Sequence, residues 1–194
     1  MAIRKVIQAG NSLLKAKNKL VSNYNSPKIQ KLIKDLIVTN RKAGLIGIAA
    51  SQIGKNYMVF VTHPRNTKSR KLGKTDKLRI YINPKITYYS QKKNIIYEGC
   101  GSVADGAIFG PVLRPEEIEV QAINKKGQKF SLRADGILAR VIQHEYDHLR
   151  GIEFIQKVSD YSKIVVQAHY RKYIRNSPLQ KKNSLITKIE YKKL

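Results

Sequence analysis

The chain has 194 residues, 42% of them apolar, and its 38 Lys and Arg against 13 Asp and Glu give a net charge of +25. This length predicts one sizeable core, and no stretch reaches the roughly 18 uncharged apolar residues that a membrane helix needs. A single cysteine excludes an intrachain disulfide, and the N-terminus lacks the apolar core of a secretory signal, so we expect a reducing compartment, the cytoplasm.

The first half of the chain predicts one helix followed by short strands. Residues 11–43 are expected to be helical, with Ser26-Pro27 as a helix start, because apolar residues recur at helical spacing at Ile29, Leu32, Ile33, Leu36 and Ile37. The β-like segments that follow are 44–54 (a turn and strand), 57–62, 78–82 and 86–97 (a strand pair). A basic loop between the second and third of these contains Arg65, Lys68, Arg70, Lys71 and Lys74.

The second half predicts a hairpin and then a helix. Residues 118–123 alternate in polarity, and a turn at 124–127 leads to a second strand at 129–133. A helix is expected from Asp135 or Gly136 until Gly151 ends it. Strands followed by one central helix indicate an α+β fold.

The C-terminal part is strongly basic. From Asp160 onward there are nine basic residues: Lys163, Arg171, Lys172, Arg175, Lys181, Lys182, Lys188, Lys192 and Lys193. Spacing of Lys163, Val166, Tyr170 and Tyr173 predicts a helix with one apolar and one basic side, followed by irregular chain after Ser177-Pro178. We therefore divide the chain into a catalytic part, residues 1–159, and a basic C-terminal helix and tail, residues 160–194.

The strongest chemical signal is His144-Glu145-Tyr146-Asp147-His148. Residues four apart share one helix face, so two imidazoles can bind one metal ion with Glu145 beside them as general base. The same pattern also arises by chance on solvated helices. Here the flanking residues Ala139, Val141 and Ile142 are apolar, which indicates a buried helix whose histidines need partners.

A third metal ligand is expected, because catalytic divalent sites usually have three protein ligands and one open position. The longer pattern H-E-x-x-H-x-x-G-x-x-H fails, since Phe154 occupies its last position. Cys100, between two glycines, is a better candidate than His63 or His169, which lie in basic segments. From the residues alone, a structural or nucleophilic role for Cys100 stays open.

A third segment, 47–52, combines small residues with an amide side chain. Gln52 could donate a hydrogen bond to a developing oxyanion. A tightly packed turn beside a helix explains the same residues equally well.

Together the three segments resemble the peptide deformylase family, which carries G-x-G-x-A-A-x-Q, E-G-C-x-S and H-E-x-D-H in this order. They occur here as residues 45–52, 98–102 and 144–148, and the likeness extends from about Ile7 to Phe154. It includes Gln8-Ala9-Gly10-Asn11, Val112-Leu113-Arg114-Pro115 and residues 134–140.

The resemblance implies antiparallel β-sheets around the helix that carries His144 and His148. It also implies a hydrolase that removes the formyl group from N-formylmethionine of nascent polypeptides. The implied metal is Fe(II), with Zn, Ni or Co as substitutes, bound by Cys100, His144 and His148. Glu145 would be the acid–base group. The implied oxyanion donors are Gln52 and the Gly101 N–H. The implied substrate contacts are Leu45, Ile46, Gly47, Glu98, Gly99 and Val141. Arg114 is expected to support the site by pairing with Glu98.

Three positions depart from the family pattern. Leu45 replaces the first glycine and could narrow the groove for the substrate backbone. Gly101 replaces the usual leucine after the cysteine, and Ala104 replaces a proline. The Ser-Val-Ala ending resembles the eukaryotic organellar branch, although we expect no transit peptide because family-like sequence begins within the first ten residues.

Three functions compete at this point. The first is an active deformylase. The second is a ribosome- or RNA-binding protein on a deformylase scaffold, with catalysis weakened by Leu45 and Gly101. The third is a zinc endopeptidase that cleaves internal peptide bonds. In the first two functions, the positive charge predicts that the C-terminal tail contacts the ribosome. The alternative is a solvated lysine-rich surface with no specific partner. We expect no membrane contact and make no prediction of the oligomeric state.

Overall fold

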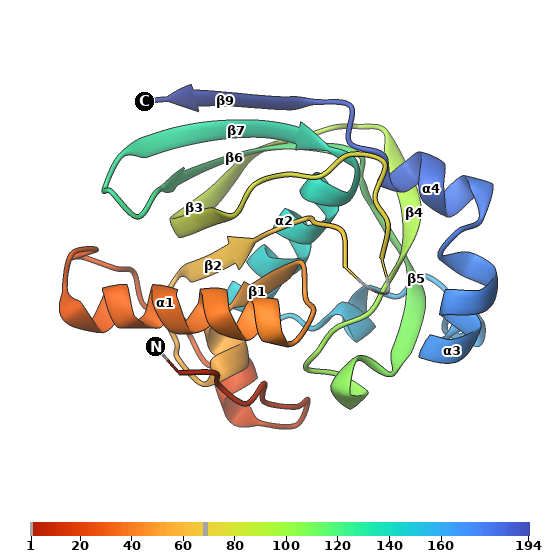
Figure 1. Cartoon of the computed structure of the whole chain (residues 1–194), viewed down its shortest axis with the longest axis horizontal. Helices are drawn as coiled ribbons and strands as arrows, with labels where there is room; N and C mark the ends of the chain where they lie inside the picture. The colour runs from red at the N-terminus through yellow and green to blue at the C-terminus, as the bar shows by residue number, and fades with distance from the viewer. Residues whose placement is uncertain (1, 68–69) are drawn as a thin grey trace.

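A long helix lies inside a curved β-sheet, and a smaller sheet closes its other side (Figure 1). The structure, a computed structural model, describes residues 2–67 and 70–194; Lys68 of the predicted basic loop lies outside the described residues. The helices are α1 (Pro27–Lys42), α2 (Gly136–Leu149), α3 (Gln167–His169) and α4 (Pro178–Ser184). The strands are β1 (Gly47–Ala49), β2 (Val59–Thr62), β3 (Arg79–Tyr89), β4 (Lys93–Glu98), β5 (Ile108–Pro115), β6 (Glu117–Ile123), β7 (Lys129–Asp135), β8 (Val165–Val166) and β9 (Ile189–Lys193).

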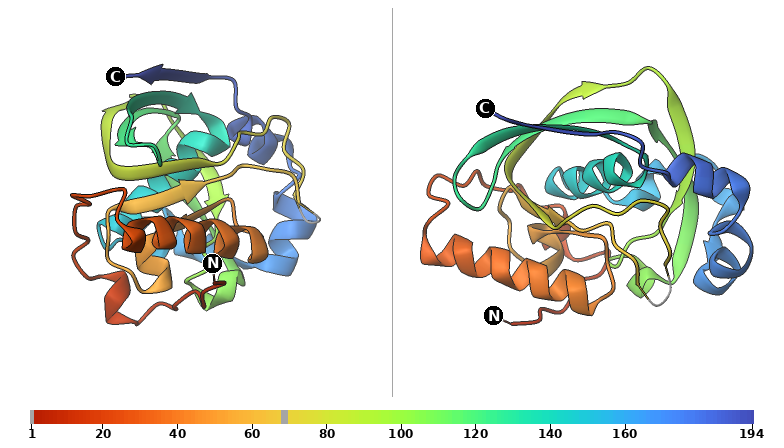
Figure 2. Two further views of the ribbon diagram at one scale, coloured as in Figure 1. Left: turned by 60° about the vertical axis from the view of Figure 1, so that its left-hand side comes forward. Right: turned by 45° about the horizontal axis from the view of Figure 1, so that its top comes forward.

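Both sheets are antiparallel in every pair of strands. The large sheet has the order β1-β2-β3-β6-β7-β9, and the small sheet has the order β4-β5-β8. The large sheet curves around α2, and α1 covers the outer face of β1 and β2 (Figure 2). The predicted α+β fold with antiparallel sheets around a central helix is confirmed.

Strands β1 and β2 are buried on both faces because helices cover each side. Phe60 packs in the core around α2, whereas its neighbours Val59 and Val61 pack in the core beneath α1. In β1, Ile48 joins the α1 side and Ala49 the α2 side. A continuous apolar strand is what such a two-sided position requires.

Helix α2 starts and ends where the sequence predicts. Gly136 has a φ of +55° and lies directly against the backbone of Leu185, so no side chain fits at this position. Leu138, Ala139 and Ile142 are then buried against the large sheet. The helix stops at Leu149, and Gly151 follows in the left-handed region.

Two predicted elements in the first half of the chain are wrong. Helix α1 begins only at Pro27, where Ser26 caps it; before it, the backbone groups of Lys19 and Val21 bond to Asn56 and Asn83 instead of to a helical turn. Residues 86–97 are not a strand pair. They belong to β3 and β4, which lie in different sheets.

The C-terminal segment differs most from the prediction. Val166 lies in β8, and Tyr170 is buried while Tyr173 is 57% exposed, so the four residues at helical spacing do not form one amphipathic helix. The chain after Ser177-Pro178 is also regular: α4 packs against β4 and α2, and β9 adds a sixth strand beside β7. Within residues 2–67 and 70–194, no helix combines the length and hydropathy that crossing a membrane requires.

Candidate active site

Two histidines and the cysteine meet at the inner end of a pocket. Helix α2 places His144 and His148 one turn apart, with ring centroids 5.0 Å from each other. Cys100 follows β4, and its Sγ lies 3.2 Å from His148 Nε2. The three side chains are largely buried, and their ligand atoms lie within 4.8 Å of one another. The structure therefore brings the three predicted metal ligands together.

The chemistry of this donor set suits a transition metal. A sulfur and two imidazole nitrogens favour borderline-soft divalent ions. Burial lowers the pKa of His148 well below its usual value, and the charges of His144 and Arg114 lower it further. A neutral His148 keeps the lone pair that a metal ligand needs. These three residues fit a metal ion.

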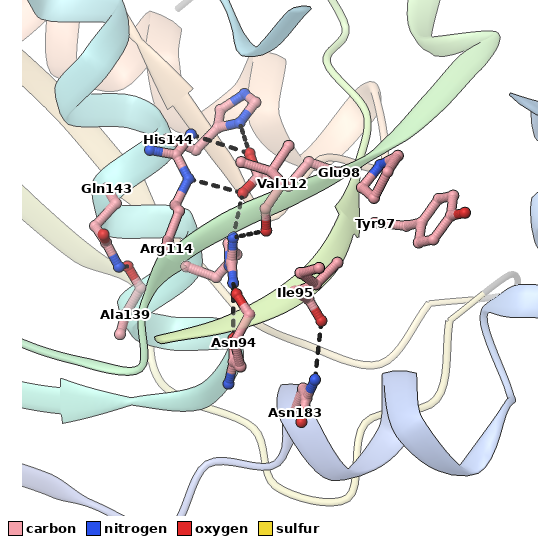
Figure 3. Close-up of polar contacts among 12 residues, drawn as sticks. Asn94, Ile95, Tyr97, Glu98, Val112, Arg114, Ala139, Gln143, His144 and Asn183 are labelled. Carbon is pink, nitrogen blue, oxygen red and sulfur yellow. Dashed lines mark hydrogen bonds and ion pairs between the residues drawn. The ribbon is translucent and has the colours of Figure 1, made fainter. Parts of the chain in front are cut away.

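Glu98 orients His144 from behind (Figure 3). At the end of β4, this carboxylate accepts hydrogen bonds from Arg114 Nε at 2.8 Å and Nη2 at 3.1 Å, and from Arg140 Nη1 at 2.9 Å. Its Oε2 also lies 2.9 Å from His144 Nδ1. Burial raises the pKa of Glu98, but Arg114, His144 and Arg140 outweigh burial and hold it well below the usual value. A fixed anion at Nδ1 leaves the other nitrogen of His144 for the cluster.

The expected pair of Glu98 with Arg114 is thus present, but its surroundings were not foreseen. Arg114 also contacts Asp147 at 2.6 Å. Arg140 is held by the Val112 carbonyl at 2.8 Å and by Asn94 Oδ1 at 2.8 Å. The signal for Arg140 was in the sequence: it is a charged residue in the buried stretch of α2, four positions before His144.

Glu145 is buried beside the cluster and lies against Gly47. Burial raises the pKa of Glu145 to about 7. Its Oε2 has no hydrogen-bond partner among the described residues. A Cβ at Gly47 would lie 2.5 Å from Glu145 Oε1 and 2.5 Å from Val141 Cγ2. Glycine at this position is therefore what lets β1 approach the carboxylate.

Gln52 faces the cysteine loop from a 3-10 turn after β1. Its Oε1 accepts from the Ala49 N–H at 2.8 Å, which fixes the direction of the amide. Nε2 consequently points at Cys100 Sγ, at 3.5 Å, and at Ser102 Oγ, at 3.2 Å. A hydrogen-bond donor is thereby held beside the three ligand atoms.

The N-terminal segment holds these two loops together, which the sequence did not predict. The Ile7 N–H donates to the Gln52 carbonyl at 2.9 Å, and the Ala9 N–H donates to the Ser102 carbonyl at 2.7 Å. Between them, Gln8 Nε2 donates to the Gly101 carbonyl at 2.9 Å. The family likeness includes residues 8–11 but does not reveal this bridging role.

A pocket of about 600 Å³ opens in front of the cluster. The predicted site residues among its lining are Leu45, Ile46, Gly47, Gln52, Glu98, Gly99, Cys100, Gly101, Val141, His144 and Glu145. His148 and Arg114 lie behind this lining. The pocket also has walls that were not predicted, built by residues 70–73 and 170–185.

Comparison with known proteins identifies the family and the fold. The sequence model of the family described as polypeptide deformylase matches residues 3–163. The chain belongs to the polypeptide deformylase family. Peptide deformylase 1 of Ralstonia nicotianae is 39% identical over 132 residues, which cover 68% of this chain and 73% of that protein. Peptide deformylase of Pseudothermotoga lettingae is 34% identical over 175 residues, which cover 90% and 94%.

A solved member of the family has the same architecture. The crystal structure of class I type b peptide deformylase from Acinetobacter baumannii, bound to Met-Ala-Ser, superimposes with a TM-score of 0.76. It is 28% identical and covers 81% of this chain and 99% of that one. Members of the family are metal-dependent, in agreement with the Cys100, His144 and His148 cluster.

Proposed function

We propose that this chain is a metal-dependent hydrolase that removes the formyl group from N-formylmethionine at the start of nascent polypeptides. One observation carries the proposal: three buried ligand atoms, a buried carboxylate and an amide donor converge on one pocket of a deformylase-family chain. The Acinetobacter relative holds a peptide that begins with methionine, which supports the same class of substrate here.

Cys100, His144 and His148 would hold one divalent ion, which we propose to be Fe(II), with Zn, Ni or Co as possible substitutes. Such an ion supplies a Lewis acid that polarises an amide carbonyl and makes a water molecule more acidic. Glu98, supported by Arg114, keeps the His144 ring in the orientation for binding.

The remaining residues of the site would bind substrate and move protons. Glu145 takes the proton from the attacking water and passes it to the departing amine. Gln52 Nε2 and the Gly101 N–H stabilise the negative charge that develops on the formyl oxygen when water adds to the formyl carbon. The residues proposed to contact the substrate are Leu45, Ile46, Gly47, Glu98, Gly99 and Val141, all of which line the pocket.

Metal analysis and formate release test this function together. Protein purified without oxygen should carry about one divalent ion per chain and release formate from formyl-Met-Ala-Ser. Cys100→Ser should lose the metal, whereas Glu145→Gln should keep the metal and the fold but lose kcat by roughly 10²- to 10⁴-fold. Full metal content in Cys100→Ser would remove Cys100 from the ligand set, and near-normal kcat in Glu145→Gln would require another base.

The same assays separate the two competing functions. A deformylase-like protein with weakened catalysis would bind RNA and release little formate. Family membership does not support this function, for which the positive charge of the chain is the only argument. A zinc endopeptidase would cleave internal bonds and accept peptides with other blocked N-termini.

We also propose that the chain acts in the cytoplasm and meets the ribosome through its basic C-terminal segment. Arg171 and Lys172 are exposed there and could contact RNA phosphates. Arg171→Gln/Lys172→Gln should reduce cosedimentation with ribosomes at low salt, whereas Lys125→Gln/Lys126→Gln, with the same loss of charge, should not. Equal sedimentation of the two variants would argue against this contact. Deletion from Asp160 is a poor test, because it also removes β9 and α4.

A further inference from the structure

The C-terminal segment is joined to the cysteine loop by a column of stacked side chains. The Phe109 ring on β5 packs so closely on Gly99 that a Cβ there would lie 2.7 Å from it. Tyr170 stacks on Phe109, with centroids 4.0 Å apart and an angle of 5°. The Arg175 guanidinium lies 5.2 Å from the Tyr170 centroid. The segment beyond the family match thus forms a fixed wall of the substrate pocket.

Besides Arg140, which is bonded to Glu98, five cationic side chains line this pocket, and we call them the cationic rim: Arg70, Lys71, Arg175, Lys181 and Lys182. They come from two segments far apart in the sequence, the loop before β3 and the chain from the π-helical turn (Tyr170–Ile174) to α4. The loop runs beside α4 in all views (Figures 1 and 2), and a Cβ at Gly73 would lie 3.1 Å from Leu185 Cδ1. Two elements therefore place positive charge on the same opening.

Few carboxylates accompany the cationic rim in the described lining of the pocket. Among the described residues that line it, the only carboxylates are Glu98 and Glu145, both buried at the inner end. Glu98 is already bonded to two arginines and His144. Arg70 Nη1 is buried, and no described group accepts a hydrogen bond from it. Burial lowers the pKa of Arg70, and the charge of Arg175 lowers it further, as expected where a counter-anion is missing.

The inner walls of the pocket have the opposite character. Ile96, Phe109, Ile137 and Val141 make its interior apolar. A ligand that satisfies both regions has an apolar group at its inner end and an anion a short distance away. A peptide with methionine followed by an acidic residue has this pattern. A nucleic acid backbone would satisfy the rim and leave the apolar interior without a ligand.

We propose that the cationic rim is a specificity subsite for an acidic side chain in one of the first two residues after methionine. The inference rests on the proposed function, because it assigns the rim to the same peptide substrate. Exposed charge pairs are individually weak, so several together should raise kcat/KM for an acidic peptide by about 5- to 10-fold.

Matched peptides test this subsite. Formyl-Met-Ala-Glu-amide and formyl-Met-Ala-Gln-amide differ by one charge, and the amide removes the terminal carboxylate; a second pair carries Glu or Gln directly after methionine. One pair at least should show a preference for Glu, expressed in KM and not in kcat. The preference should shrink between about 50 mM and about 300 mM salt.

Paired lysine variants locate the effect. Lys181→Gln/Lys182→Gln should reduce the preference for Glu to less than about twofold without changing kcat/KM for the Gln peptides. Lys125→Gln/Lys126→Gln removes the same charge from the exposed β6–β7 turn and should keep the preference. Equal kcat/KM for Glu and Gln in both pairs would overturn the proposal, as would an unchanged preference in the rim variant.

Binding of the formyl-free peptides separates this inference from the proposed function. Tighter calorimetric binding of Met-Ala-Glu-amide or Met-Glu-Ala-amide than of its Gln partner, without formate release from any formyl peptide, would support the rim and overturn the deformylase function. Formate release without any charge preference would overturn the rim alone. Loss of affinity for a short RNA in the rim variant, with no charge preference among peptides, would assign the rim to RNA and likewise overturn the proposal.

Discussion

Gly47→Ala is the smallest change that should disable the site without touching a metal ligand. The new methyl group would lie 2.5 Å from Glu145 Oε1 and 2.8 Å from Glu145 Cγ. An ordinary contact of a Cβ is at least 3.4 Å, so the carboxylate must retreat by about 0.9 Å. Val141 Cγ2, also at 2.5 Å, limits the escape of the methyl group itself.

The size of the effect follows from this displacement. Misplacing a catalytic group by about 1 Å can cost roughly 10²-fold in rate. We therefore expect Gly47→Ala to lower kcat by about 10²-fold, with the metal content unchanged. Overpacking in a buried strand should also cost about 1–3 kcal/mol of the free energy of unfolding, which urea denaturation would measure.

A double-mutant cycle shows whether the loss acts through Glu145. In the Glu145→Gln background the base is already absent, so adding Gly47→Ala should change kcat by less than about threefold, because coupled residues are strongly non-additive. Formate release measures all four proteins, and metal analysis confirms equal loading. Additive losses in the double variant would refute the reasoning, as would normal kcat in Gly47→Ala alone.

Three further predictions follow from single contacts. Gln52→Leu should keep the metal and lower kcat by roughly 10²- to 10³-fold; an unchanged kcat would leave Gln52 a packing role. Leu45→Gly should lower KM more for long than for short formyl peptides if Leu45 narrows the groove, and equal effects would contradict this. Burial raises the pKa of Asp35, but hydrogen bonds from the Ala2 N–H and Arg4 outweigh it and hold the pKa below its usual value. Such a carboxylate stabilises the fold above about pH 4 and loses this contribution as the pH falls through its folded-state pKa. Urea titrations should therefore show Asp35→Asn less stable by about 1 kcal/mol at pH 7, with the difference shrinking below about pH 4; a constant difference would contradict the assignment.

The sequence predicts helix α2 and the position of its two histidines because these features depend on residues that are close together in the chain. Helix α2 carries apolar residues at helical spacing between two glycines with positive φ, and the same period places His144 and His148 on one face. The hairpin at Asn124 to Gly127 is equally local. The residues favour Cys100 over the remaining histidines as third ligand, but only the family likeness decides between this and a structural or nucleophilic role, since its approach depends on how β4 packs on α2.

The elements that failed are those whose partners lie far along the chain. Asn18 donates to the Leu149 carbonyl at 2.9 Å, and Asn83 holds both backbone groups of Val21, so the chain before α1 is fixed by tertiary contacts. Strand β9 has a polar, lysine-rich sequence that reads as a solvated tail, yet it pairs with β7 over five residues. Its exposed edge position tolerates such residues because only one face packs on the core.

The two departures from the family pattern at Leu45 and Gly101 are best understood as one. A Cβ at Gly101 would lie 3.5 Å from both terminal methyl groups of Leu45, so the leucine side chain occupies the space beside the glycine. The family pattern has the small residue at position 45 and the leucine at position 101, whereas here the large and small partners are exchanged. An exchange across one contact conserves local volume, which is the kind of change that packed cores tolerate best. The Gly101 backbone is further held by Gln8, and this loop is therefore less loose than a glycine alone would suggest. The exchange changes which wall of the pocket carries the leucine side chain, position 45 instead of position 101. It therefore changes the shape of the pocket that the residues after methionine must fit.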